Sequence, residues 1–177
     1  MSFLSIAHLG NPILRQKAKS VSREELFSIE FQNFISDLIE TMLEYDGVGL
    51  AATQVHVLKQ VFVFEVKNNP RYPNRDAIPL TIVINPVFKK LSKKMEEDFE
   101  SCLSIPGLVA KVPRHSSLTL EGLTREGKPL EMKLSGFAAR VAQHENDHLH
   151  GIVYLDRVLD KPSLAFEREH RKFCHSP

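Results

Sequence analysis

The sequence predicts an α+β fold in a single domain, and three observations support this prediction. The length of 177 residues fits one ordinary domain. Apolar residues recur at helical spacing in one segment before the middle of the chain and in another after it. Between these segments, β-branched and aromatic residues form short runs that are typical of strands. Helices separated from strands along the chain indicate the α+β class.

The first predicted helix covers residues 22–45. Ser22 and Glu25 have the spacing of a capping box, and neither Pro nor Gly interrupts the segment. Asp46 and Gly47 would end the helix. The residues that recur at helical spacing and form one apolar face are Leu26, Phe31, Phe34, Ile35, Leu38, Ile39 and Met42. The pattern therefore predicts one continuous amphipathic helix.

The composition of the middle of the chain predicts short strands. Residues 61–64 and 81–84 are rich in β-branched and aromatic side chains, and the Pro- and Asn-rich segment between them predicts a loop. Residues 89–98 are charged and expected to be exposed. Two further apolar runs flank 125–128, whose sequence REGK predicts a hairpin turn.

A second helix is predicted at 135–150, with Ser135 as its N-cap and Gly151 as its stop. Residues 161–177 mix aromatic and charged side chains, so this tail is expected to be a short helix or a frayed end.

Composition excludes several classes of protein. The formal net charge is +1, which argues against nucleic-acid binding through overall charge. Two cysteines are too few for a disulfide framework and indicate a reducing compartment. The N-terminus lacks the pattern of a signal peptide, and no apolar run approaches the ~20 residues of a membrane span. A soluble protein without a membrane partner is expected.

The segment 143–148, with sequence QHENDH, carries the clearest chemical signal. His144 and His148 are four residues apart, so a helix places both on one face, where they can hold one metal ion. Glu145 lies beside them, where a carboxylate can take a proton from a metal-bound water. Phe137 and Val141 continue the same face. The alternative is an ordinary helix in which the motif has arisen by chance.

A third metal ligand is needed, and the sequence offers two sources. A downstream ligand would indicate an HExxH metallopeptidase, and the candidates are Asp156, Asp160, Glu167, Glu169, His170 and His175. Gly151 fits the extended HExxHxxGxxH pattern, but Tyr154 stands where its third histidine would lie. Cys102 would instead complete a Cys-His-His set with one position open for water. A lone cysteine in an apolar neighbourhood is more often an inert core residue.

The segment 47–54, with sequence GVGLAATQ, is the third feature. Its two glycines allow the backbone to pass close to a ligand, and Gln54 can both donate and accept hydrogen bonds. A helix end and tight turn with an exposed Gln54 is the alternative interpretation.

In this order, GVGLAATQ, ESCLS and QHENDH resemble the three motifs of peptide deformylases, which are GxGLAAxQ, EGCLS and QHExDH. The sequence GNPILR at 10–15 is also similar to the opening of that family, so the resemblance covers nearly the whole chain. It implies one catalytic domain over 1–177, with antiparallel or mixed β-sheets packed around the HExxH helix and with an N-terminal helix. The implied reaction removes the formyl group from the N-terminal methionine of new polypeptides and releases formate.

The resemblance assigns roles residue by residue. The matching metal ligands are Cys102, His144 and His148. Glu145 matches the general base and acid that serves a metal-bound water attacking the formyl carbon. Gln54 and the backbone N–H of Leu103 match the groups that stabilise the oxyanion. The residues at substrate-binding positions are Gly49, Val48, Ser101, Arg114, Phe137 and Val141, of which Val48, Phe137 and Val141 would line the methionine pocket.

Ser101 departs from the family, which usually has Gly before the ligand cysteine. If position 101 needs a positive φ, Ser would cost about 1–2 kcal/mol. If φ is negative, the added CH₂OH only changes the wall of the cleft, and activity with an altered pocket is expected. The Pro- and Asn-rich segment at 70–79 is predicted to shape one rim of the site.

The resemblance implies one divalent metal ion per chain, natively Fe²⁺, although Zn²⁺, Ni²⁺ and Co²⁺ suit the same ligands. It implies formyl-Met nascent peptides as partners and a bacterial cytoplasm as location. A transient ribosome contact through 161–177 is compatible with it, but a solvated tail is the simpler interpretation.

Three hypotheses follow and differ in testable ways. A deformylase would lose metal when Cys102 is replaced by Ala. An HExxH metallopeptidase with a downstream ligand would keep both metal and activity in that variant. A non-catalytic relative would bind metal or peptide without turnover, with Ser101 as the cause.

Overall fold

The computed structural model describes residues 3–67, 69 and 75–174 of the chain. Its strands are β1 (Gly49–Ala51), β2 (Val61–Val66), β3 (Ile78–Lys89), β4 (Met95–Cys102), β5 (Ile105–His115), β6 (Ser117–Leu123), β7 (Pro129–Ser135) and β8 (Ala165–Phe166). Its α-helices are α1 (Arg23–Leu26), α2 (Ile29–Glu44), α3 (Gly136–Leu149) and α4 (Glu167–Cys174), and short 3₁₀ helices lie at Pro12–Arg15, Ala52–Val55, Tyr154–Arg157 and Lys161–Ser163.

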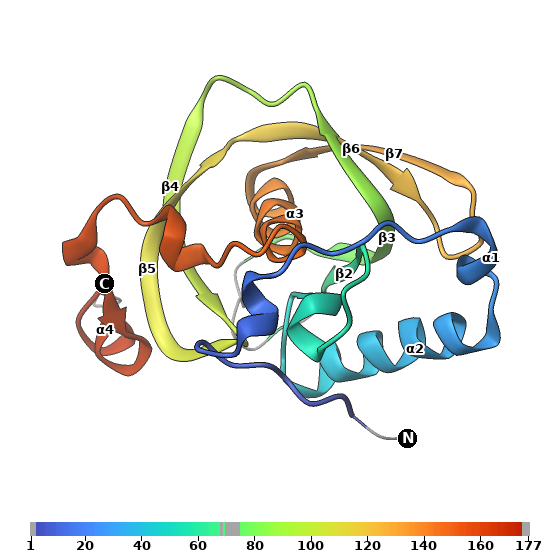
Figure 1. Ribbon diagram of the computed structural model, residues 1–177. Coiled ribbons are helices and arrows are strands. Elements are labelled where there is room, and N and C mark those ends of the chain that lie inside the picture. The colour runs from blue at the N-terminus through green and yellow to red at the C-terminus, as the bar shows by residue number, and fades with distance from the viewer. Residues whose placement is uncertain (1–2, 68, 70–74, 175–177) are drawn as a thin grey trace.

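The strands form two antiparallel sheets, and α3 lies between them in the middle of the molecule (Figure 1). One sheet has the order β1-β2-β3-β6-β7 and the other has the order β4-β5-β8. The predicted α+β class with sheets around the HExxH helix is therefore confirmed. None of the helices in the described part of the chain is long and apolar enough to cross a membrane.

The five-stranded sheet is buried on both faces at β2, which explains the continuous apolar run of this strand. Successive side chains of a strand point to opposite faces. Phe62 and Phe64 accordingly pack in the cluster that contains Val141 of α3, whereas Val61 and Val63 pack in the cluster that contains α2. A third cluster joins Cys102, Ala110, Val112 and Tyr154 beneath the three-stranded sheet. The first of these clusters packs α3 against the five-stranded sheet.

The prediction of one continuous helix over 22–45 is wrong. Two helices, α1 and α2, occupy this segment and are separated at Phe27 and Ser28. Ser22 caps α1 through Glu25, as predicted, and Ser28 begins α2 by accepting a hydrogen bond from the Phe31 N–H. A second serine cap therefore restarts the helix without any Pro or Gly. Asp46, with φ 50°, follows the end of α2.

The predicted strands and hairpin are present, and other strands were missed. β2 and β3 contain the two predicted runs, and β6 and β7 flank the predicted turn, in which Gly127 has φ 71°. Residues 89–98 are largely exposed but include the end of β3 and the start of β4. β1, β4 and β5 were not predicted. The loop at 68–74 falls mainly outside the described residues.

Candidate active site

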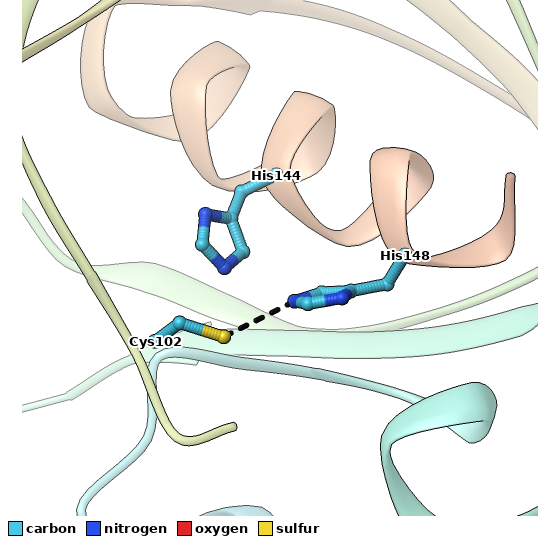
Figure 2. Close-up of side chains that lie close together, drawn as sticks. All are labelled: Cys102, His144 and His148. Carbon is cyan, nitrogen blue, oxygen red and sulfur yellow. Dashed lines mark hydrogen bonds between the residues drawn. The ribbon is translucent and has the colours of Figure 1, made fainter. Parts of the chain in front are cut away.

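The two histidines project from the same side of α3, which begins and ends where the sequence predicted within a residue. Ser135 is its N-cap but makes no side-chain capping bond, and Gly151 follows its end with φ 74°. His144 and His148 are both buried, and Figure 2 shows their rings turned toward Cys102. Burying polar side chains costs free energy unless they are paired with a partner or a ligand. The two buried histidines therefore mark this face of α3 as a candidate functional site.

Cys102 completes the group from the last position of β4. Its Sγ lies 3.2 Å from His148 Nε2, the contact drawn in Figure 2. One ligand atom from each of Cys102, His144 and His148 lies within 4.8 Å of the others. A thiolate with two imidazoles is a donor set that suits Zn²⁺ and related divalent ions. Burial lowers the pKa of His148, which favours the neutral imidazole that binds a metal.

The downstream candidates for a third ligand lie elsewhere. Within the described residues, the one group of three or more potential ligands that could share an ion consists of Cys102, His144 and His148. Asp156 pairs with Arg15, and Glu167 pairs with Arg171. His175 lies outside the described residues. This geometry gives no support to a metallopeptidase ligand set.

The carboxylate of Glu100 contacts the ring of His144, and the sequence analysis did not identify this residue. Its Oε2 lies 2.8 Å from His144 Nδ1, which leaves the other ring nitrogen to face Cys102. Burial alone would raise the pKa of Glu100, but Arg114 and His144 hold that pKa well below its usual range. A charged carboxylate behind a ligand histidine fixes the ring and raises its basicity. The match of Glu100 to the first residue of EGCLS was the available signal.

Arg114 is buried next to the candidate site but does not line the cavity. Its guanidinium makes two bonds to Glu100, at 2.9 and 3.0 Å, and a third to Asp147 at 2.5 Å. Asp147 also pairs with Arg157. Arg114, which the resemblance places among the substrate-binding positions, thus belongs to the buried ion-pair network that holds Glu100.

Glu145 lies against the backbone of β1. A Cβ built on Gly49 would stand 2.3 Å from Glu145 Oε1, so glycine is required for this approach. Glu145 Oε2 is buried and has no hydrogen-bond partner among the described residues. Burial raises the pKa of the Glu145 carboxyl to about 7. A carboxyl group with this pKa can both accept and return a proton near neutral pH.

Gln54 is buried, which excludes the alternative of an exposed turn residue. Its Oε1 accepts a hydrogen bond from the Ala51 N–H, and its Nε2 is 3.5 Å from Cys102 Sγ and 3.2 Å from Ser104 Oγ. The amide group is thus oriented with its donor toward the metal-binding group. Ser104, which sequence reasoning did not single out, helps to fix that orientation.

A cavity opens beside these groups between β1, β4 and α3. The residues that line it are Gly47, Val48, Gly49, Gln54, Phe99, Glu100, Ser101, Cys102, Leu103, Phe137, Arg140, Val141, His144 and Glu145. Most of the predicted site residues are thereby brought together. Arg114 and His148 do not line it, whereas Phe99, Glu100 and Arg140 do and were not predicted.

The backbone of Ser101 does not have a positive φ, so the serine causes no strain of that kind. The non-glycine residues with positive φ among the described residues are Asp46, His56, Asn85 and Lys90. Ser101 lies in β4 and lines the cavity, so its CH₂OH changes the wall without a backbone cost.

The predicted rim at 70–79 is partly described. Residues 70–74 lie outside the described part, but the Arg75 guanidinium stands 4.7 Å from the ring centroid of Phe137 and pairs with Asp98. Arg75 therefore packs against Phe137, which is one of the residues that line the cavity.

An α+β domain that joins a thiolate, two helical histidines and an adjacent buried carboxylate has the donor set of a metallohydrolase. The family description that matches residues 3–163 is polypeptide deformylase. Peptide deformylase 1 of Nitrosomonas europaea is 42% identical over 161 residues, which cover 91% of this chain and 90% of that protein. The chain belongs to the polypeptide deformylase family and is a hydrolase of that kind, as the resemblance implied.

Solved structures agree with this assignment. The class I type b peptide deformylase from Acinetobacter baumannii with bound Met-Ala-Ser has a TM-score of 0.86 and 36% identity, and the match covers 89% of this chain and 99% of that chain. The peptide deformylase from Thermotoga maritima has a TM-score of 0.79 and 35% identity, with the same two coverages.

Proposed function

We propose that this enzyme removes the formyl group from N-terminal methionine by metal-dependent hydrolysis and releases formate. The observation that carries the proposal is the convergence of Cys102, His144 and His148 beside the buried carboxylate of Glu145, at the end of a partly apolar cavity. The family assignment supplies the substrate class.

Cys102, His144 and His148 would hold one divalent cation, and we propose Fe²⁺ as the native metal, with Zn²⁺, Ni²⁺ and Co²⁺ as compatible substitutes. When bound, the cation supplies Lewis-acid activation of water and of the formyl oxygen. Glu100 keeps the imidazole of His144 in the orientation that this binding needs.

Glu145 is the proposed general base and acid. With a pKa of about 7, its carboxylate takes a proton from water as the formyl carbon is attacked, and then gives a proton to the leaving amine. The close backbone of Gly49 holds this carboxylate beside the cavity.

Gln54 and the backbone N–H of Leu103 are the proposed donors to the negative oxygen that forms on the formyl carbon. The Gln54 amide already faces Cys102 Sγ, and Leu103 lines the same cavity. Loss of one such donor typically lowers the rate about 10²–10³-fold.

The methionine side chain is proposed to enter the cavity between Val48, Phe137 and Val141. The backbone at Gly49 and Ser101, on the two strands that border the cavity, would hold the peptide chain. The Met-Ala-Ser peptide bound in the structure from A. baumannii supports the proposed substrate class, because it has the sequence of a deformylated product.

We further propose that the reaction takes place in a bacterial cytoplasm, on nascent chains. A transient ribosome contact through residues 161–177 is compatible with this setting. Neither nucleic acid nor a membrane is a proposed partner.

The test is formate release from formyl-Met-Ala-Ser by protein purified without oxygen, beside Glu145→Gln and Cys102→Ala. Release by the parent, metal without turnover in Glu145→Gln, and loss of metal in Cys102→Ala would support the proposal. Metal and activity retained in Cys102→Ala would overturn it. One metal per chain with no release by the parent would identify a protein that only binds.

A further inference from the structure

The N-terminal segment 6–9 lies between two parts of the chain that carry residues of the site. The Ala7 N–H donates to the carbonyl of Gln54 at 2.7 Å, and the Leu9 N–H donates to the carbonyl of Ser104 at 2.8 Å. Gln54 belongs to the 3₁₀ helix Ala52–Val55, whereas Ser104 lies in the turn between β4 and β5, 50 residues further along the chain. The segment therefore joins two distant pieces of the chain by backbone hydrogen bonds (Figure 1).

The side chains of this segment are buried on both sides of the junction. Ile6 belongs to the apolar cluster that contains Ala52 and Val55. Ala7 belongs to the cluster that contains Cys102. Because both clusters hold the segment, its backbone N–H groups have fixed positions relative to the site.

Gln54 and Ser104 also bind each other through their side chains. Gln54 Nε2 donates to Ser104 Oγ at 3.2 Å and lies 3.5 Å from Cys102 Sγ. Gln54 Oε1 is occupied by the Ala51 N–H at 2.8 Å, which fixes the direction of the amide. Both side chains are almost fully buried. An amide nitrogen carries two hydrogens, so Ser104 uses one of them and leaves the other for the metal-binding group.

We propose that segment 6–9 is a positioning element of the reaction, which acts by holding Gln54 and Ser104 at the separation that orients the Gln54 amide. The inference rests on the proposed deformylase function, in which Gln54 stabilises the negative oxygen that forms on the formyl carbon. The segment acts through backbone hydrogen bonds and not through contact with the substrate. A displacement of about 1 Å can lower a rate about 10²-fold, so kcat should depend on the segment.

A double-mutant cycle tests the link between Ser104 and Gln54. Ser104→Ala removes the acceptor of one Nε2 hydrogen, and we expect it to lower kcat for formyl-Met-Ala-Ser about tenfold, with KM changed by less than about twofold. In a Gln54→Ala background the same substitution should change kcat by less than about twofold, because no amide is left to orient. A serine that only stabilises the fold would lower kcat by the same factor in both backgrounds.

A proline substitution tests the segment itself. Ala7→Pro removes the N–H that the Gln54 carbonyl accepts, so it should lower kcat in the parent but not in Gln54→Ala. His8→Pro is the matched control. Among the backbone hydrogen bonds of the described residues, His8 takes part through its carbonyl, so this substitution leaves both donors in place. Its kcat should stay within about twofold of the parental value.

Thr41→Val controls for the loss of a buried hydroxyl that also holds the start of the chain. Thr41 Oγ1 accepts a hydrogen bond from the Leu4 N–H at 3.0 Å, on α2 and outside the site. The substitution should lower the melting temperature and leave kcat unchanged, since the lost bond contributes to stability alone. An equal loss of kcat in Thr41→Val and Ser104→Ala would overturn the inference.

Proton exchange of the Gln54 side-chain amide, measured by NMR on metal-free protein, gives a readout that does not depend on turnover. We expect slow exchange in the parent and faster exchange in Ser104→Ala and Ala7→Pro. If Ala7→Pro does not fold, as judged by circular dichroism, Leu9→Pro takes its place, because it removes the other donor. Unchanged exchange and kcat in the folded variants would overturn the inference. Failure of the parent to release formate would refute the proposed function, while the exchange data would still test the positioning.

Discussion

The carboxylate of Glu145 lies so close to the backbone of Gly49 that position 49 has room only for hydrogen. A Cβ there would stand 2.3 Å from Oε1 and 2.7 Å from the carboxyl carbon. Real atoms do not approach so closely, so either Glu145 or β1 must move. Because the proposed proton transfer depends on the position of this carboxylate, the clash should act on catalysis more than on folding.

We therefore expect Gly49→Ala to lower kcat by about 10²-fold while the protein keeps its metal, since a misplacement near 1 Å can have this effect. Steady-state formate release and metal analysis would measure both quantities. Gly47→Ala is the control, because its Cβ would meet Leu103 and Met42 at 3.1 Å, a strain that small shifts relieve. Parental activity in Gly49→Ala would show that Glu145 is not held as described.

The role of Glu100 in stability and in metal binding can be tested by a single substitution. Glu100→Gln keeps the shape but removes the charge that balances Arg114 and Arg140, both buried. We expect a loss of about 3 kcal/mol in the free energy of unfolding, and a metal affinity lower by roughly 10–100-fold. Urea unfolding and chelator competition would measure these two losses.

Glu97→Gln is the matched control, because it removes a carboxylate from the same strand at an exposed position. It should change stability by less than about 0.5 kcal/mol. Equal effects of the two substitutions would contradict a specific role for Glu100.

The residues that gather at the candidate site could be predicted from the sequence because they lie in short motifs. His144, His148 and Glu145 follow from helical spacing alone, and Cys102 and Gln54 follow from the resemblance. The contacts of Glu100 with His144 and Arg140 could not be predicted in this way, although Glu100 itself lies in a motif. These contacts join β4 to α3 across about 40 residues of sequence, and no local pattern specifies such a pairing.

At the scale of elements, the break between α1 and α2 shows how a single serine can override a helical pattern. Ser28 Oγ accepts from the Phe31 N–H at 3.2 Å and donates to the Glu25 carbonyl at 2.8 Å. It therefore ends one helix and starts the next. The apolar spacing continues through the break because both helices bury the same side, with Leu26 and Phe31 in one cluster.

Ser28→Ala should lower the free energy of unfolding by about 1 kcal/mol, since an N-cap is lost. Ser28→Asp should retain most of the stability, because a carboxylate also accepts the capping bond. Thermal unfolding of the two variants beside the parent would measure the difference. If both variants lose the same amount, the side-chain cap does not contribute to stability.

The strands β4 and β5 were missed for a related reason. β4 has the sequence MEEDFESC, whose charges resemble an exposed linker. It lies at the end of its sheet and leaves only part of its surface buried, so charged residues are tolerated there. Pairing with β5, from Met95 opposite His115 to Cys102 opposite Ile105, is what makes it a strand. The two strands form a hairpin around residues 103–104, and the charged composition of β4 does not indicate this pairing.

At the scale of the whole molecule, the proposed metal ligands come from two separate layers. Cys102 belongs to the three-stranded sheet, whereas His144 and His148 belong to α3. A cation held by all three would join these layers directly. Because the unfolded chain does not hold the ligands together, metal binding should favour the folded state, by about 2.7 kcal/mol when free metal is at 100 times the dissociation constant.

Removal of the metal by a chelator should therefore lower the melting temperature of the parent by about 5–10 °C, since 1 kcal/mol corresponds to roughly 2–4 °C in a chain of this size. Addition of Zn²⁺ should restore it. Cys102→Ala should melt at nearly the same temperature with and without chelator, because it lacks the ligand that joins the sheet to the helix. A parent that binds one metal per chain but melts equally with and without it would show that the two layers are held by the Glu100 ion pairs alone.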